Sequence, residues 1–217
     1  MESLMEALVG RQASKNKSLL PFSAPTYEQV RRFFGDFVRA MYRLEVVGAD
    51  RLPVSGPVVV APNHASVLDG IILGVAISRE LRFVAKAELW QSRLLAWVLD
   101  GLDAIRIRRG CSSDHLALAR MRQALDAGQA VAIFPQGAVR GDRVWHRGAA
   151  RVALVTGAPL VPVRLVGTAQ ALSRGRIGFP RLRVIVGEPI EVARAPEDPT
   201  AATELTERLR IAVESLA

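Results

Sequence analysis

The sequence predicts an α/β fold with a mixed, mainly parallel central sheet flanked by helices. Short runs of β-forming residues alternate with stretches whose apolar residues recur at helical spacing, which is typical of parallel sheets covered by helices. The run at 131–134 is apolar throughout, as expected of a strand buried on both faces. Hydrophobic residues fill 50% of the 217 positions, enough for the core of one large α/β domain.

Residues 1–44 are predicted to form an N-terminal amphipathic helical appendage that precedes the main domain at 45–217. Thr26 and Gln29 match a capping box, and apolar residues at helical spacing extend the helix from there to residue 44. Its apolar face carries three phenylalanines and its polar side four arginines (Phe33, Phe34 and Phe37; Arg31, Arg32, Arg39 and Arg43). Such a helix can lie in a membrane interface, with its arginines at anionic head groups, or it can pack on the domain.

The elements of the main domain follow in order. Strands are predicted where β-branched and apolar residues dominate, at 58–61, 81–85, 104–108, 130–134, 160–166 and 182–186. Helices are predicted where apolar residues recur at helical spacing, at 66–77, 87–99, 112–127, 148–155 and 200–216. Gly128 follows the third of these helices as a C-terminal cap would. Pro162 removes a backbone donor, so its strand is predicted at a sheet edge or with a bulge.

The composition limits the partners and the compartment of this protein. Lys and Arg outnumber Asp and Glu by 29 to 21, which favours an anionic membrane surface, an acidic carrier protein or nucleic acid. Nucleic acid is not predicted, since the sequence has no zinc-ligand spacing, RNA-binding aromatic motif or basic recognition helix. The single cysteine, Cys111, fits a reducing compartment. Because the apolar runs are shorter than the roughly 20 residues of a membrane span, the chain is expected in the cytoplasm, peripheral on the cytoplasmic face of the membrane.

His64 follows the predicted strand at 58–61, and ligands of open α/β sheets gather where strands end. A neutral imidazole at this place can take a proton from a hydroxyl that attacks an ester or thioester carbonyl. Asp69 is the nearest carboxylate and can fix the tautomer of the ring. Residues five apart are about 140° around an α-helix, so the two meet if His64 lies on the turn and Asp69 in the first helical turn.

The same spacing has a structural interpretation. Ser66 and Asp69 match a capping box, in which Asp69 would only satisfy a donor at the start of the helix. Capping and catalysis do not exclude each other, because the turn that Ser66 caps can bring Asp69 to His64. Asn63 and Ser66 are therefore predicted to support this turn.

Five segments of the chain together carry a further pattern. In order, they read N-H-A-S-V-L-D at 63–69, F-V-A-K-A-E-L at 83–89, D-A-I-R-I-R-R-G at 103–110, F-P-Q-G-A-V-R at 134–140 and L-V-P-V at 160–163. Over nearly all of residues 45–190, the chain resembles the glycerol-phosphate and lysophosphatidate acyltransferase family. The resemblance implies that 45–217 is an acyltransferase domain, with His64 as general base and Asp69 orienting it.

The resemblance also implies the substrates. A fatty acyl group would move from acyl-CoA or acyl carrier protein to the hydroxyl of a lysophospholipid acceptor, with 1-acylglycerol-3-phosphate as acceptor and phosphatidic acid as product. The acceptor and its phosphate would be bound by the remaining motif residues (Lys86, Arg109, Gln136, Gly137 and Arg140). Neither a metal nor a tightly bound cofactor is expected, because the thioester is an activated co-substrate and the histidines and cysteine lack ligand spacing.

Two departures from the family pattern bear on the acceptor. Gln136 stands where the family usually has glutamate, and Arg140 comes one place late. Gln136 can still bond an acceptor hydroxyl, but it adds an amide donor and removes a negative charge. The alternatives are acyl transfer to another lyso-lipid or a glycolipid, or a non-catalytic lipid-binding protein.

Overall fold

A computed structural model describes residues 23–108, 114–137, 144–173 and 176–217. Within these ranges, the main sheet has seven strands in the order β1-β9-β6-β2-β5-β3-β4. Their bounds are β1 (Leu44–Val47), β2 (Val58–Pro62), β3 (Leu81–Lys86), β4 (Ile105–Ile107), β5 (Ala130–Ala132), β6 (Leu160–Val166) and β9 (Leu182–Val186). Neighbouring strands are parallel except for β6 and β9, which are antiparallel. The predicted mixed, mainly parallel sheet is confirmed.

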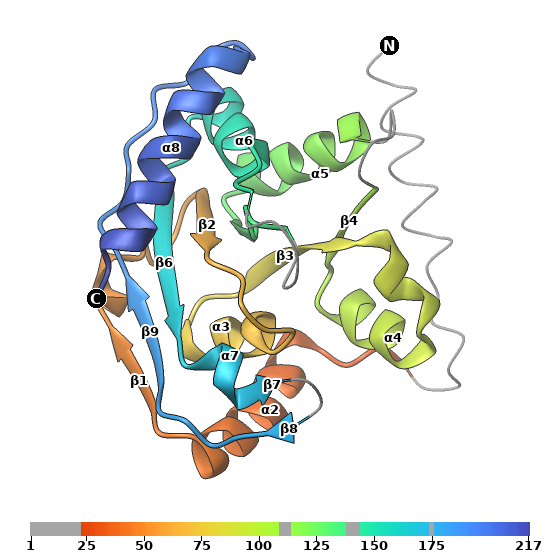
Figure 1. Cartoon of the computed structure of the whole chain (residues 1–217). Helices are drawn as coiled ribbons and strands as arrows, with labels where there is room; N and C mark the ends of the chain where they lie inside the picture. Colours follow the sequence, from red (N-terminus) through yellow and green to blue (C-terminus); the bar gives the residue numbers. More distant parts are fainter. Residues whose placement is uncertain (1–22, 109–113, 138–143, 174–175) are drawn as a thin grey trace.

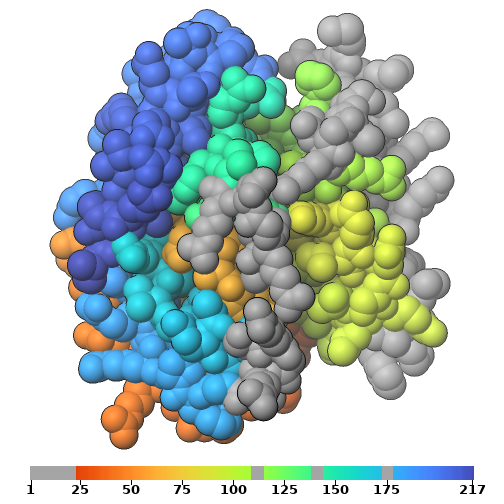
Figure 2. Space-filling view, in the orientation of Figure 1, coloured from red at the N-terminus to blue at the C-terminus, as the bar shows by residue number. Residues whose placement is uncertain are grey.

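Helices cover both faces of this sheet (Figure 1). The α-helices are α2 (Tyr27–Met41), α3 (Asp69–Ala76), α4 (Arg93–Gly101), α5 (Asp114–Asp126), α6 (Gly148–Thr156), α7 (Thr168–Ala171) and α8 (Pro199–Ser215). Two short 3-10 helices, η1 (Ala49–Arg51) and η2 (Ala87–Gln91), and a small hairpin of β7 (Leu172–Ser173) and β8 (Arg176–Ile177) complete the described part. In the space-filling view, α8 lies on the left, with the neighbouring α6 beside its upper part and the η2–α4 segment on the right (Figure 2).

The central strand β2 divides the hydrophobic core into two layers. Val58 and Val60 pack with residues of α2 and α3, whereas Val59 and Ala61 pack with residues of α5, α6 and α8. Successive side chains of a strand point to opposite faces, so one apolar run supplies both layers. All four side chains are fully buried. This rigid centre holds the residues that follow β2.

The helix α2 begins as the sequence predicts, with the capping box of Thr26 and Gln29 formed in both directions. It ends at Met41 rather than near residue 44, because β1 begins at Leu44 and joins the sheet beside β9. This strand was not predicted from the sequence. One side of α2 packs on α3, while Phe33 and Phe37 on the other side are 72% and 54% exposed. Among the described helices, none combines the length and apolarity needed to cross a bilayer.

The prediction that the strand with Pro162 lies at a sheet edge was wrong, whereas its pairing on the β9 side is irregular at the proline: the three steps from Leu160 to Val163 face four steps from Val186 to Ile190. β6 lies inside the sheet, and its register with β2 runs without interruption past Pro162. The ladder between β6 and β9 starts one step later, with Val163 opposite Val186. On that side the carbonyl of Pro162 accepts the N–H of Gly187, beyond the end of β9. The N–H that proline lacks would face Gly187, so this pair keeps only one of its two possible bonds and the β6–β9 ladder ends there.

Candidate active site

Three adjacent parallel strands, β2, β5 and β3, bring the candidate residues together at their carboxyl ends. His64 follows β2, Gln136 lies in the turn after β5, and Lys86 is the last residue of β3. Parallel strands end at the same edge of a sheet, so residues far apart in sequence meet there. The strand order thus gathers three of the motif segments into one region.

His64 and Asp69 are in direct contact. The Nδ1 atom of His64 lies 2.8 Å from Oδ2 of Asp69. The Asp69 side chain is fully buried, whereas 19% of the His64 side chain is exposed. A carboxylate can only accept hydrogen bonds, so Nδ1 carries the proton of the neutral imidazole. The lone pair of Nε2 is then available to take a proton from another group.

The Asp69 carboxylate also organises the turn between β2 and α3. Its Oδ2 atom accepts the backbone N–H groups of Ala65 and Ser66 at 2.6 and 2.8 Å. Asp69 is the first residue of α3, which corrects the predicted helix start at Ser66. Ser66 Oγ accepts the N–H of Leu68 at 3.3 Å, so only the Asp69 half of the capping box is formed. One carboxylate therefore both orders the turn and contacts the ring.

Contacts with β6 and with the segment after β5 hold the chain around His64. The Asn63 amide makes two bonds to the backbone of Leu165 in β6, with Nδ2 donating to the carbonyl at 3.1 Å and Oδ1 accepting the N–H at 2.6 Å. Oε1 of Gln136 accepts the backbone N–H of His64 at 2.7 Å. The ring of Phe134 packs on the His64 ring with centroids 4.4 Å apart. Together with Asp69, these contacts fix His64 from three sides.

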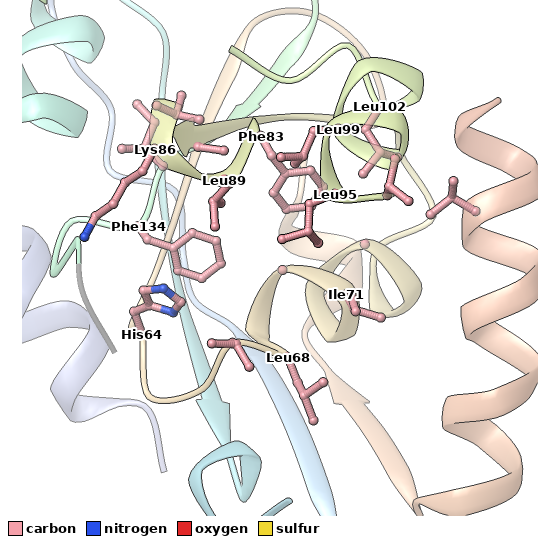
Figure 3. Close-up of a pocket in the computed structure, with 18 of the residues that line it drawn as sticks. His64, Leu68, Ile71, Phe83, Lys86, Leu89, Leu95, Leu99, Leu102 and Phe134 are labelled. Atoms are coloured by element: carbon pink, nitrogen blue, oxygen red, sulfur yellow. The ribbon is translucent and has the colours of Figure 1, made fainter. Parts of the chain in front are cut away.

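His64 stands at one end of a pocket of about 2430 Å³ with mainly apolar walls. Figure 3 shows the apolar side chains that extend from the His64 end between α3, β3 and α4 (Leu68, Ile71, Phe83, Leu95, Leu99 and Leu102). From α2, Tyr27 and Phe34 add to the wall. Burial raises the pKa of Tyr27, so its hydroxyl stays protonated at neutral pH. The pocket is suited to a long apolar group whose reactive end lies at His64.

Positive charge is found in the same pocket. Lys86 is half-buried, and no hydrogen bond or salt bridge joins its side chain to another described residue. Its side chain points toward the His64 end in Figure 3. Arg147 also lines the pocket and precedes α6, whose first turn has no side-chain cap. Free N–H groups at a helix start favour anions. Arg109 and Arg140, the other predicted phosphate contacts, lie outside the described residues.

Sequence reasoning did not identify the pocket walls. The segment predicted as one helix at 87–99 is divided into η2 and α4, and Leu95 and Leu99 of α4 face the pocket. His146 is exposed, as expected, but it also lines the pocket. Apolar periodicity marks a buried face without distinguishing packing on protein from lining a pocket. Gly74 could have indicated the pocket from the sequence, because a glycine inside an apolar helix leaves space beside the helix.

Comparison with known proteins bears directly on this site. A family model described as acyltransferase matches residues 43–166, more than half of the chain. Chloroplast 1-acyl-sn-glycerol-3-phosphate acyltransferases of Arabidopsis thaliana and Brassica napus are each 26% identical over 186 residues, covering 78% of this chain and 52% and 54% of those proteins. An uncharacterized protein of Mycobacterium leprae is 27% identical over 232 residues, covering 83% of this chain and 61% of that protein. The chain thus spans about half to three fifths of the length of these relatives.

The fold agrees with this match. The crystal structure of the 1-acyl-sn-glycerophosphate acyltransferase of Thermotoga maritima superposes with a TM-score of 0.67 at 18% identity, covering 97% of this chain and 86% of that one. At this identity the likeness establishes the fold. Membership of a family rests on the match to the family model, which includes the three strand ends that carry His64, Lys86 and Gln136. By this sequence match over a shared fold, the chain belongs to the acyltransferase family.

Proposed function

We propose that this chain is an O-acyltransferase that moves a fatty acyl group from an acyl thioester to the hydroxyl of a lysophospholipid. The contact between His64 and Asp69 at one end of an apolar pocket carries the proposal. A base in this place suits a reaction between a lipid alcohol and a fatty acyl thioester. The names of the plant relatives favour 1-acylglycerol-3-phosphate as acceptor and phosphatidic acid as product.

His64 is the general base of the proposed reaction. Its Nε2 takes the proton of the acceptor hydroxyl while the oxygen attacks the carbonyl carbon of the thioester. Asp69 keeps Nδ1 protonated and stabilises the imidazolium that forms. When the tetrahedral intermediate collapses, the new C–O bond remains, the C–S bond breaks and the thiolate takes the proton from the imidazolium. The proposal assigns no metal or bound cofactor a role, because acyl-CoA or acyl carrier protein delivers an already activated acyl group.

The two kinds of pocket wall match two parts of the substrates. The apolar walls of α3 and α4 suit the fatty acyl chain, for which burial contributes about 0.8 kcal/mol per CH₂ group. Lys86, Arg147 and the start of α6 suit the phosphate of the acceptor, since cations and free N–H groups bind oxyanions. We extend this phosphate site to Arg109 and Arg140 on the strength of the family resemblance.

We further propose that the chain is peripheral on the cytoplasmic face of an anionic membrane, with α2 as a contact. Phe33 and Phe37 expose large apolar rings on the side of α2 that does not pack on α3. Arg32 and Arg39 on the same helix are exposed and would meet anionic head groups. Phe33 and Phe34 also line the pocket, so a lipid that leaves the bilayer at α2 would enter the pocket directly.

The test is acyl transfer by the purified full chain. Wild type, His64→Ala and the control His115→Ala are incubated with lysophosphatidate and either acyl-CoA or acyl carrier protein, and thioester loss and lipid product are followed. His115 is exposed on α5. We expect His64→Ala to lower the rate on the order of a hundredfold to ten-thousandfold, as loss of a general base does, and His115→Ala to act as wild type.

Other outcomes separate the parts of the proposal. Equal rates for wild type and His64→Ala would show that the mechanism is wrong. Thioester consumption with another lyso-lipid or a glycolipid alone would keep the reaction and exclude 1-acylglycerol-3-phosphate as acceptor. Lipid binding without any thioester loss would identify a non-catalytic lipid-binding protein.

A further inference from the structure

Gln136 lies behind the wall of the pocket. Its neighbours Pro135 and Gly137 line the pocket, whereas Gln136 does not and is only 8% exposed. The turn closes through the N–H of Gly137, which donates to the carbonyl of Phe134 at 3.0 Å. Gly137 has a φ of 64°, which glycine adopts without steric cost. In this turn, Gln136 faces away from the pocket while the residues on either side face it.

The buried side chain of Gln136 is directed at the backbone of the base. Its Oε1 atom accepts the N–H of His64 at 2.7 Å, at the short end of the range for such bonds. The two residues are 72 positions apart, and the pairing of β2 with β5 brings their turns side by side. An oxygen in this buried position does not reach the space in which an acceptor would lie.

We propose that Gln136 is a positioning residue for His64 and not a contact of the acceptor. The proposal rests on the function proposed above for His64. Asp69 anchors the His64 ring, and Asn63 anchors the preceding residue to β6. Gln136 is the side chain that anchors the His64 peptide group itself. With this bond in place, Nε2 is held at a fixed point in the pocket.

The role requires an acceptor oxygen at the end of the side chain. Glutamate supplies such an oxygen, whereas methionine has a similar length and supplies none. Without the bond, the His64 N–H is left unpaired and its peptide group can shift. A displacement of about 1 Å in a reacting group can cost on the order of a hundredfold in rate. Acceptor contacts remain, so the loss should fall on kcat and leave the KM for the acceptor unchanged.

The experiment compares Gln136→Met and Gln136→Glu with wild type and with Gln123→Met, a control at an exposed position of α5. Kinetics with lysophosphatidate and an acyl thioester give kcat and the KM for the acceptor. Hydrogen exchange of the His64 amide, followed by NMR, reports the bond without requiring activity. Thermal unfolding checks that each variant is folded.

For Gln136→Met we expect kcat about tenfold or more below wild type, an acceptor KM within about twofold, and faster exchange of the His64 amide. Gln136→Glu should keep kcat within about threefold and keep the amide protected, because it retains the acceptor oxygen. Gln123→Met should match wild type in all three measurements.

The proposal is overturned if Gln136→Met leaves kcat and His64 exchange unchanged, or if it raises the acceptor KM while kcat stays constant. If Gln136→Met fails to fold, Gln136→Glu decides: a folded variant that loses both kcat and amide protection contradicts the role of the oxygen. If wild type transfers no acyl group to any acceptor, the function proposed for His64 fails, while hydrogen exchange still tests the bond from Gln136.

Discussion

Replacing Asp69 with asparagine separates the catalytic role of this residue from its role at the helix start. The carboxylate is fully buried and its Oδ2 atom accepts three hydrogen bonds, from the His64 ring and from the N–H groups of Ala65 and Ser66. Asparagine keeps one acceptor oxygen and can hold the two backbone groups. It has no charge to stabilise an imidazolium, and it adds an NH₂ donor at a buried place.

The magnitudes follow from these three bonds. Hydrogen bonds to charged groups contribute about 1.5–3 kcal/mol and neutral ones about 0.5–1.5 kcal/mol, so weakening all three costs about 3 kcal/mol. A neutral amide costs less to bury than a carboxylate, which offsets part of this loss. We therefore expect the free energy of unfolding to fall by about 1–3 kcal/mol in total. That lowers Tm by roughly 2–12 °C for a chain of this size. We expect kcat to fall on the order of a hundredfold to ten-thousandfold.

The assay measures kcat and Tm for Asp69→Asn and for Asp198→Asn. Asp198 caps α8, where its Oδ1 accepts the N–H of Thr200 at 2.8 Å, far from the pocket residues in sequence and on another helix. Asparagine caps helices about as well as aspartate, so this control should keep Tm within about 2 °C and kcat unchanged. If Asp69→Asn lowers Tm but keeps kcat within about threefold of wild type, the residue is a helix cap and its assignment to catalysis is wrong.

Substitutions at three further places, Gly74, Lys86 and the exposed side of α2, test the pocket and the membrane contact. At Gly74, an added Cβ meets its neighbours no closer than 3.5 Å, so Gly74→Ala should be tolerated. Gly74→Leu should reduce kcat/KM for long-chain thioesters more than for short ones, and an equal loss for all chain lengths would argue against an acyl chain in this part of the pocket. Lys86→Met should raise the KM for the anionic acceptor about tenfold or more, while Lys86→Arg should keep a KM close to that of wild type. An unchanged KM in both variants would show that Lys86 is not part of the phosphate site. The double substitution Phe33→Ser and Phe37→Ser should weaken flotation with anionic vesicles, whereas Val54→Ser, in a loop outside α2 at a residue that is 93% exposed, should not. Equal flotation of wild type, the double variant and Val54→Ser would exclude α2 as the contact.

The sequence predicted those features that depend on residues close together in the chain. The capping box of Thr26 and Gln29 spans one helical turn, and the contact of His64 with Asp69 spans one loop and the start of one helix. The strand predicted at 58–61 likewise depends on one short apolar run, and β2 extends only one residue further, to Pro62. Such local geometry leaves few solutions: the spacing identified the capping box, and for His64 and Asp69 it allowed a contact that the family resemblance then favoured. The family match at 43–166 agrees with the resemblance that these segments carry.

Features that depend on the order of the strands were decided by the tertiary structure. The position of β6 inside the sheet is one such feature. Two others are the hydrogen bonds between Asn63 and Leu165, 102 positions apart, and the bond that the N–H of His64 donates to Gln136, 72 positions away. Strand order follows from how all helices and strands pack together, and no short segment contains that information. For the same reason, the sequence identified Gln136 as a site residue but not the direction of its side chain. Periodicity showed that α3 and α4 have apolar faces, and their placement around His64 made those faces the walls of a pocket.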